Sequence, residues 1–402
     1  MEPKDYIARE EQFGAHNYHP LPVVLEKGKG VFVWDVTGKR YFDFLSGYSA
    51  LSQGHCHPKI IAALNEQAEK LTLVSRAFYS DALGEFMAFA CDFFHYDKLL
   101  PMNTGAEAVE TALKLCRRWG YRRKGVLPEK AKIIVCNENF HGRTVTIISM
   151  SSDPTAYTDF GPYTPGFIKI PYNNTQALEE ALQDPDVVGF LVEPIQGEAG
   201  VVVPDEGYLH SCHALCKTHN VLFMADEIQT GIGRTGRMLA CDHEGVRPDI
   251  LILGKALSGG VTPVSAVLAD DPIMLTIAPG EHGSTYGGNP LAAKVGIAAL
   301  QVAREEHLAE NADEMGRLFR REMEALQHPM ISLVRGKGLL NAVVTTPKEG
   351  KTAWDICLAL MENGLIAKPT HDHIIRFTPP LVITEAEILE ALDVIRNTFL
   401  QF

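Results

Sequence analysis

The stretch PDILILGKALSGG, residues 248–260, decides the fold that we expect for this chain. Its four apolar residues Ile250–Leu253, bounded by Pro248 and Gly254, predict a short buried strand. Lys255 would then lie at the carboxyl end of a strand, where open α/β sheets bind their ligands. Desolvation there would lower its pKa and leave a neutral amine, which can form a Schiff base with a carbonyl group. A solvated lysine that follows a strand is the alternative, and for Lys255 alone it is the more common case.

A second stretch, VLFMADEIQTG at residues 221–231, has the same form and favours the ligand-site interpretation of Lys255. It predicts a buried strand that ends in Asp226 and Glu227. Two strands that each deliver a titratable group at their carboxyl ends indicate a common crevice. A carboxylate facing a pyridine nitrogen would keep that nitrogen protonated and make the ring an electron sink.

Length and charge exclude several classes of protein. The 402 residues can bury a large core, and 37 basic against 50 acidic residues give a net charge of −13, which argues against a nucleic-acid partner. No apolar run is long enough to span a bilayer, so we expect no membrane partner. The start, MEPKDYIARE, has no signal-peptide core. We therefore expect a cytoplasmic location, with the mitochondrial matrix open if a transit peptide has been removed.

The eight cysteines are scattered and mostly lie in apolar patterns, which predicts reduced cysteines in an intracellular protein. Two groups invite comparison with a metal site, His55-Cys56-His57 and the pair Cys212 and Cys216. Neither has a second ligand pair at zinc-like spacing, so we predict no metal.

Strands predicted near residues 132, 187, 221 and 250 are separated by helical stretches, which indicates a parallel sheet. Thr104 and Glu107 fit a capping box at the start of a predicted helix that carries Val109 and Leu113 on one face. Such a start leaves free backbone amides that suit a phosphate group. A plain capped helix is the alternative and the commoner use of this pattern.

The segment Asp226–Gly231 followed by Gly254–Gly260 resembles the signature of class III, pyridoxal-phosphate-dependent aminotransferases, and the resemblance covers essentially the whole chain. It implies the α/β architecture called fold type I, with a large domain built on a mostly parallel sheet and a smaller α+β C-terminal domain. We place an N-terminal segment with small antiparallel strands at 1–50, the large cofactor domain at 51–297 and the small domain at 298–402. The resemblance also implies a homodimer with shared active sites, possibly a higher oligomer.

The resemblance assigns roles by position. Lys255 and Asp226 would be catalytic. The implied pyridoxal-phosphate-binding residues are Thr104, Gly105, Ala106, Phe140, His141, Asp226, Gln229, Lys255, Ser284 and Thr285. Phe140 would lie on the cofactor ring, and Thr285 would reach the cofactor phosphate of the neighbouring subunit.

Within the class, the chain is most similar to the members that act on L-ornithine and 2-oxoglutarate. The implied substrate-binding residues are Tyr18, Tyr48, Arg143, Glu198 and Arg376. His141 is a departure, because many animal members of this group have Trp there. Members that act on 4-aminobutyrate or acetylornithine are the alternative, followed by an aminomutase of the same fold. A non-catalytic protein that binds a nucleotide with its glycine loops is a further class.

The two substrates place opposite demands on one pocket. Ornithine would present its δ-amine with its α-carboxylate near Arg143, whose planar guanidinium can bind a carboxylate through two hydrogen bonds. Its methylenes would then lie where 2-oxoglutarate places its own α-carboxylate, near Arg376. An unpaired buried guanidinium facing methylenes would cost several kcal/mol, so we expect Glu198 to neutralise Arg376 in the first half-reaction and release it in the second.

Overall fold

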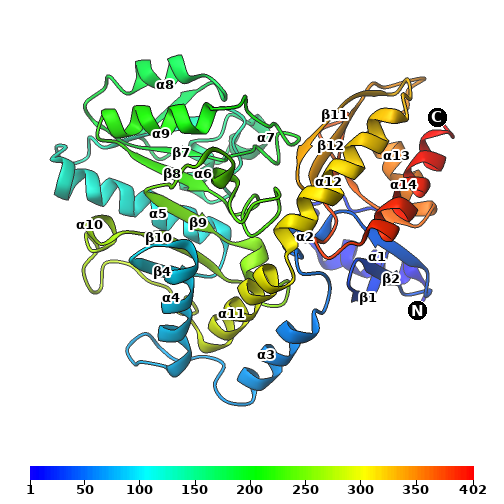
Figure 1. The fold of residues 1–402 in the computed structure, drawn as a ribbon, viewed down its shortest axis with the longest axis horizontal. Helices are drawn as coiled ribbons and strands as arrows, with labels where there is room; N and C mark the ends of the chain where they lie inside the picture. Colours follow the sequence, from blue (N-terminus) through cyan, green and yellow to red (C-terminus); the bar gives the residue numbers. More distant parts are fainter.

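The computed structural model describes residues 1–402 and contains three β-sheets (Figure 1). The large sheet has seven strands in the order β4-β10-β9-β8-β7-β5-β6. Their bounds are β4 Lys98–Met102, β5 Lys132–Cys136, β6 Phe167–Ile170, β7 Val187–Val192, β8 Leu222–Asp226, β9 Ile250–Leu253 and β10 Ser265–Ala269. The four predicted strands β5, β7, β8 and β9 pair in parallel, and β6, which the sequence did not predict, joins them in parallel beside β5. The strand β10 is antiparallel to both β9 and β4.

The large sheet is covered on both faces because its strands alternate apolar side chains to either side. Ile133, Val135 and Met224 pack with α5 (Gly105–Trp119) on one face. Ile134 and Phe223 pack with α8 (Thr175–Ala181) and α9 (Tyr208–Thr218) on the other. Short helices extend these layers at α6 Val145–Ser149, α7 Pro154–Tyr157 and α10 Asp271–Met274, with helical turns η1 Gly120–Lys124, η2 Ala240–Glu244 and η3 Lys255–Ser258.

A cluster of 53 buried apolar residues joins the large sheet to the rest of the chain. It includes side chains of α3 (Pro58–Ala68), α4 (Asp81–Phe94) and α11 (Pro290–Glu305) together with residues of the C-terminal part. The helix α11 passes through residue 298, and α12 begins at Leu308. The division of the chain into three domains stays a prediction.

The C-terminal part contains the sheet β11-β12-β15-β14, which is antiparallel throughout. Its strands are β11 Ile331–Lys337, β12 Leu340–Thr345, β14 Lys368–Thr370 and β15 Ile374–Phe377, and its helices are α12 Leu308–Ala325, α13 Ala353–Glu362 and α14 Glu385–Phe399. In Figure 1 these elements form the right-hand portion of the molecule, beside the N-terminal strands.

The chain's two ends share the third sheet. After α1 (Pro3–Phe13), the strands β1 (Leu25–Lys29), β2 (Phe32–Asp35) and β3 (Arg40–Asp43) form the antiparallel meander that the sequence predicts. The strand β13 (Leu365–Ile366) adds to β3 in parallel. The N-terminal segment is therefore built into the C-terminal part.

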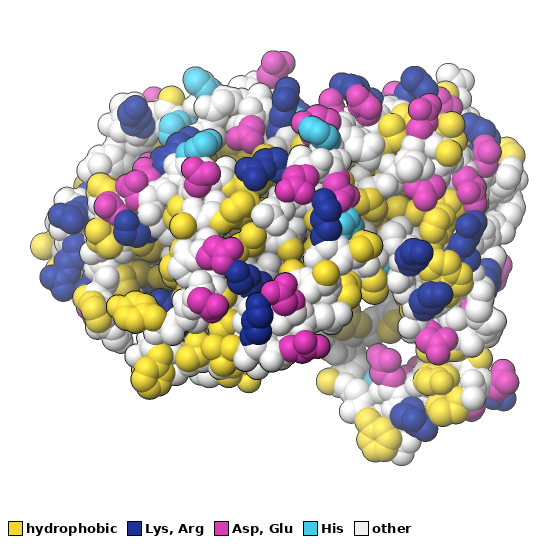
Figure 2. Space-filling view, turned by 60° about the horizontal axis from the view of Figure 1, so that its bottom comes forward, with side chains coloured by type: hydrophobic (Ala, Val, Ile, Leu, Met, Phe, Trp, Pro, Cys, Tyr) yellow, Lys and Arg dark blue, Asp and Glu magenta, His cyan; other side chains and the backbone are white.

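The surface is mixed in charge. Figure 2 shows acidic and basic side chains interspersed over one face of the molecule, without an extended basic patch. No helix combines the length and the apolar character that crossing a membrane requires.

Candidate active site

Lys255 lies directly after β9, at the start of the η3 turn, as the sequence predicts for a strand-end lysine. Its backbone has a φ of 42°, an uncommon left-handed value for a residue other than glycine. Desolvation lowers the pKa of its amine, and the nearby charge of Arg376 acts in the same direction, while Glu198 and Asp226 oppose them. Lys255 is therefore easier to deprotonate than an exposed lysine.

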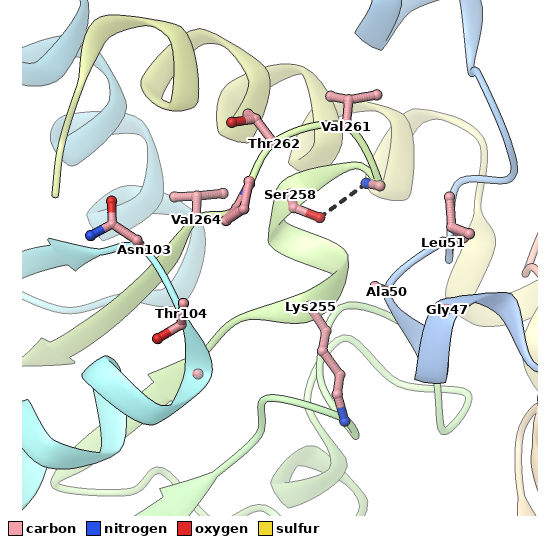
Figure 3. A pocket seen from close by; sticks show the side chains of 13 residues that line it. Gly47, Ala50, Leu51, Asn103, Thr104, Lys255, Ser258, Val261, Thr262 and Val264 are labelled. Atoms are coloured by element: carbon pink, nitrogen blue, oxygen red, sulfur yellow. Dashed lines mark hydrogen bonds between the residues drawn. The ribbon is translucent and has the colours of Figure 1, made fainter. Parts of the chain in front are cut away.

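Two adjoining cavities meet at Lys255. The first, of about 220 Å³, is lined by eight of the predicted residues, which are Gly105, Ala106, Phe140, His141, Glu198, Asp226, Gln229 and Lys255. The Arg143 guanidinium lies 5.6 Å from the centre of the Phe140 ring. The second, of about 430 Å³, lies between the start of α5 and the residues that follow β3. Figure 3 shows Lys255 between Thr104 on one side and Gly47 and Ala50 on the other.

Asp226 forms a buried pair with His141 in the first cavity. The distance between Asp226 Oδ2 and His141 Nδ1 is 2.6 Å, and Asp226 Oδ1 accepts a hydrogen bond from the Ile228 amide at 3.1 Å. Burial by itself lowers the pKa of His141, but the hydrogen bond and the charge of Asp226 outweigh burial and leave that pKa raised. The pair therefore favours a protonated imidazole at His141.

Glu193 is a buried carboxylate that the sequence analysis leaves without a role. It directly follows β7, whereas Asp226 is the last residue of β8, and its Oε2 accepts a hydrogen bond from the Phe140 amide at 2.9 Å. Burial raises its pKa to about 7. Its place after a fully apolar strand was the signal in the sequence, because Asp226 was found by the same pattern.

The start of α5 has the predicted capping box. Thr104 Oγ1 accepts a hydrogen bond from the Glu107 amide at 3.2 Å, and Glu107 Oε2 accepts one from the Thr104 amide at 2.8 Å. The amides of Gly105 and Ala106 belong to the first helical turn, which has no partners within the helix. A Cβ at Gly105 would lie 3.2 Å from Ile228 Cδ1, so a larger residue there would require the Ile228 side chain to shift by a few tenths of an ångström.

Arg376 forms an ion pair with Glu198, which lines the first cavity. Arg376 lies in β15, and its Nη1 is 2.5 Å from Glu198 Oε1. Only 4% of the Arg376 side chain is exposed. Burial by itself raises the pKa of Glu198, but the charges of Arg376, Lys255 and Arg143 and the hydrogen bond from Arg376 together outweigh burial, so that the pKa of Glu198 is lowered. The predicted charge pair is therefore formed.

Tyr48 lies in α2, the turn Ser46–Ser49 that follows the N-terminal meander. All four residues have positive φ values, 44°, 58°, 56° and 71° in order, which makes this a left-handed turn. The Arg376 guanidinium is 5.6 Å from the centre of the Tyr48 ring, and the Tyr48 carbonyl accepts a hydrogen bond from Gln229 Nε2 at 3.4 Å. Tyr48 is thus placed against Arg376.

Besides Arg143, Arg376 and Tyr48, three predicted residues do not line these cavities, Tyr18, Ser284 and Thr285. Tyr18 is 68% exposed and has Lys368 Nζ 5.7 Å from the centre of its ring. Ser284 Oγ accepts a hydrogen bond from Asn103 Nδ2 at 2.9 Å, so this loop lies beside the start of α5. Thr285, the next residue, is exposed.

Comparisons with known proteins agree along the whole chain. The family described as aminotransferase class III matches residues 13–399. The mitochondrial ornithine aminotransferase of Rattus norvegicus is 62% identical over 399 residues, 99% of this chain and 91% of that protein, and its Drosophila melanogaster counterpart is 62% identical over 393 residues, 98% and 91% respectively.

Solved structures give the same result. An ornithine aminotransferase from Toxoplasma gondii has a TM-score of 0.98 at 50% identity and covers 100% of this chain and 96% of that one. A second structure of the Toxoplasma gondii enzyme is described with partial occupancy of pyridoxal phosphate at its active site. An acetylornithine aminotransferase from Elizabethkingia anophelis has a TM-score of 0.92 at 56% identity and covers all of both chains.

Proposed function

The chain belongs to the class III aminotransferase family, and from that premise we propose that it moves the δ-amino group of L-ornithine to 2-oxoglutarate, giving glutamate 5-semialdehyde and glutamate. The observation that carries the proposal is the pair of Arg376 with Glu198, beside Tyr48, because Glu198 lines the same cavity as Lys255. While the pair is formed, the pocket is neutral overall and suits the methylenes of ornithine. When the pair is broken, Arg376 is free to bind the α-carboxylate of 2-oxoglutarate.

Family membership confirms the resemblance predicted from the sequence, together with the fold class and the dependence on pyridoxal phosphate. The residues fit that cofactor. Lys255 offers an amine, Asp226 a carboxyl group, and Gly105 and Ala106 free amides for a phosphate, all in adjoining cavities. His141 Nε2 is buried without a hydrogen-bond partner and lines the same space.

When bound, pyridoxal phosphate supplies an aldehyde that accepts an amino group and a ring that stabilises negative charge on the neighbouring carbon. We assign Asp226 to keep the ring nitrogen protonated, with His141 holding the carboxylate in place. Lys255 Nζ would take the proton from the reacting carbon of the substrate and return it on the other side of the transfer. Its lowered pKa suits a group that alternates between acid and base.

The substrate side follows from charge. With Glu198 on Arg376, the pair is neutral overall and accepts the methylenes of ornithine, whose α-carboxylate extends toward Arg143. When Glu198 turns away, Arg376 is free to bind the α-carboxylate of 2-oxoglutarate. A buried guanidinium without a partner would cost several kcal/mol. Arg376 should therefore be paired in both half-reactions, with Glu198 in the first and with the α-carboxylate of 2-oxoglutarate in the second.

The test is a panel of amino donors measured in half-reactions, so that the second substrate does not affect the result. We expect kcat/KM for L-ornithine to exceed that for 4-aminobutyrate and acetylornithine at least tenfold, which corresponds to about 1.4 kcal/mol. A higher value for acetylornithine would replace the proposal with the second candidate. That candidate is supported by the 56% identity to the Elizabethkingia anophelis enzyme.

Changing Glu198→Ala tests the charge exchange. The variant leaves Arg376 charged throughout, so glutamate should react better relative to ornithine, and ornithine should react worse in absolute terms. We expect the ornithine-to-glutamate ratio of kcat/KM to fall at least tenfold, or about 1.4 kcal/mol. An unchanged ratio would rule out this role of Glu198. Glu206→Ala, an exposed glutamate outside both cavities, is the control.

We further propose that two copies of the chain form a homodimer with shared active sites, in which Thr285 serves the neighbouring cofactor site. The exposure of Thr285 and the position of its loop beside the start of α5 support this assembly. For location, we propose the cytoplasm or the mitochondrial matrix, the latter because the similar rat and fly proteins are named mitochondrial.

A further inference from the structure

Arg234 is a buried charge that the proposed chemistry does not use. It lies in the loop between β8 and η2, its residue is 0% exposed, and no carboxylate forms a salt bridge with it. Desolvation lowers its pKa to about 9, with Asp43 as the one opposing charge. An arginine in such a place is costly unless its hydrogen bonds hold something together.

The hydrogen bonds of Arg234 join three parts of the chain. Its Nη1 donates to the Pro379 carbonyl at 2.6 Å and to the Leu339 carbonyl at 3.1 Å, both in the C-terminal part. Its Nη2 donates to Ser52 Oγ at 3.2 Å, and Ser52 is itself fully buried. The guanidinium of Arg234, in the loop after β8 of the large sheet, therefore fixes the segment after β15 relative to the segment after β3.

Both fixed segments carry substrate-side residues. Pro379 lies three positions after Arg376, and Ser52 lies four positions after Tyr48. We call the contact between these two segments, residues 46–52 and 378–381, the seam. Two further hydrogen bonds cross it, from the Leu381 amide to the Ser52 carbonyl at 2.8 Å and from Ser46 Oγ to the carbonyl of Thr378 at 2.6 Å.

We propose that Arg234 is a positioning residue that sets the place of Arg376 relative to Tyr48, and thereby the choice between amino donors. The inference rests on the proposed function of Arg376 as the group that binds an α-carboxylate next to the reacting carbon. Loosening the seam displaces Arg376, and glutamate needs Arg376 more than ornithine does, because ornithine keeps its carboxylate near Arg143.

The experiment measures kcat/KM for ornithine and for glutamate in half-reactions of the holoenzyme, using Arg234→Lys and Ser52→Ala. A purely structural loss lowers the amount of active enzyme and changes both values equally, so their ratio does not move. We expect the ornithine-to-glutamate ratio to rise at least threefold in Arg234→Lys, with the cofactor absorbance of the holoenzyme retained. A smaller change in that ratio overturns the proposal.

Arg320→Lys is the matched control. Arg320 Nη1 donates to the Gly338 carbonyl at 2.9 Å and to Asn341 Oδ1 at 2.7 Å, so it holds the same β11–β12 turn from within the C-terminal part. A threefold shift in this variant as well would mean general loosening and would also overturn the proposal. If Arg234→Lys does not fold, Ser52→Ala decides by the same threshold.

Wild-type rates separate this proposal from the proposed function. If the wild-type enzyme does not use ornithine, the function assignment fails. The ratio is then taken between glutamate and whichever donor the wild-type enzyme prefers, and the same threshold applies to Arg234→Lys.

Discussion

An exposed lysine keeps its proton until the pH approaches 10.5, whereas desolvation lowers the pKa of Lys255 below that value. Protonation of the amine blocks its reaction with a carbonyl, so the rate at which the apoprotein takes up pyridoxal phosphate should rise with pH and level off at a lower pH than it would for an exposed lysine. Absorbance after mixing measures this rate. A midpoint of this rise at or above pH 10.5 would contradict the lowered pKa. Lys255→Ala should abolish turnover and keep the circular dichroism of the folded protein.

The His141–Asp226 pair predicts a pH dependence of stability. Because the folded-state pKa of His141 lies above its ordinary value of 6.5, the pair contributes stability that is fully present below 6.5 and is lost as the pH rises through the folded value. In the apoprotein, His141→Asn should therefore lower the free energy of unfolding by about 1.5–3 kcal/mol at pH 6 and by less at pH 9. Urea unfolding at both values measures the difference. The exposed His210→Asn should show no such trend, and an equal loss at both values would contradict the charged pair.

At the level of single residues, the sequence predicted the groups that follow buried strands. Lys255 and Asp226 were found because an apolar run ending in a titratable residue is recognisable without the fold. Arg234 could not be found in this way. Its three partners come from segments more than 100 residues away in either direction, and nothing local distinguishes it from a solvated arginine in a glycine-rich loop.

The left-handed turn α2 stores strain in the element that carries Tyr48. Gly47→Ala places a side chain at a φ of 58° and should lower the free energy of unfolding by about 1–2 kcal/mol. It should also reduce the preference for ornithine over 4-aminobutyrate, because Tyr48 moves with the turn. Gly84→Ala is the control. Gly84 lies in α4 with no atom within 4 Å of the added carbon, so this change should stabilise the protein by about 0.5–1 kcal/mol. Equal effects of the two changes would contradict a strained turn.

Regular elements were predictable where their pattern is local. The parallel strands and the capping box of α5 follow from runs of apolar residues and from Thr104 with Glu107. The turn α2 was not predictable, because Ser46, Tyr48 and Ser49 have no intrinsic preference for positive φ. Their conformation is imposed by distant partners such as Thr378. The antiparallel β10 likewise depends on its neighbours rather than on its own sequence.

The shared active site can be tested on the whole molecule with mixed dimers. If Thr285 serves the neighbouring site, Thr285→Ala alone should weaken cofactor retention. A dimer of one Lys255→Ala subunit and one Thr285→Ala subunit then has one site with both changes and one with neither. That dimer should retain cofactor at one site with wild-type affinity, as measured by absorbance after dilution. If Thr285 acted within its own subunit, neither site would be intact, and retention would be weak.

The pairing of β3 with β13 also has a consequence for biogenesis. Residues 40–43 obtain this neighbour only when residues 365–366 have been made, a separation of about 320 residues. At roughly 5–20 residues per second, the ribosome needs about 16–64 seconds to close that gap. During that interval the parallel strands β5 to β9 are already available for pairing, whereas the seam around Arg234 lacks Leu339 and Pro379. A nascent chain should therefore form its cofactor half first and acquire its substrate selectivity as one of the last steps of its synthesis.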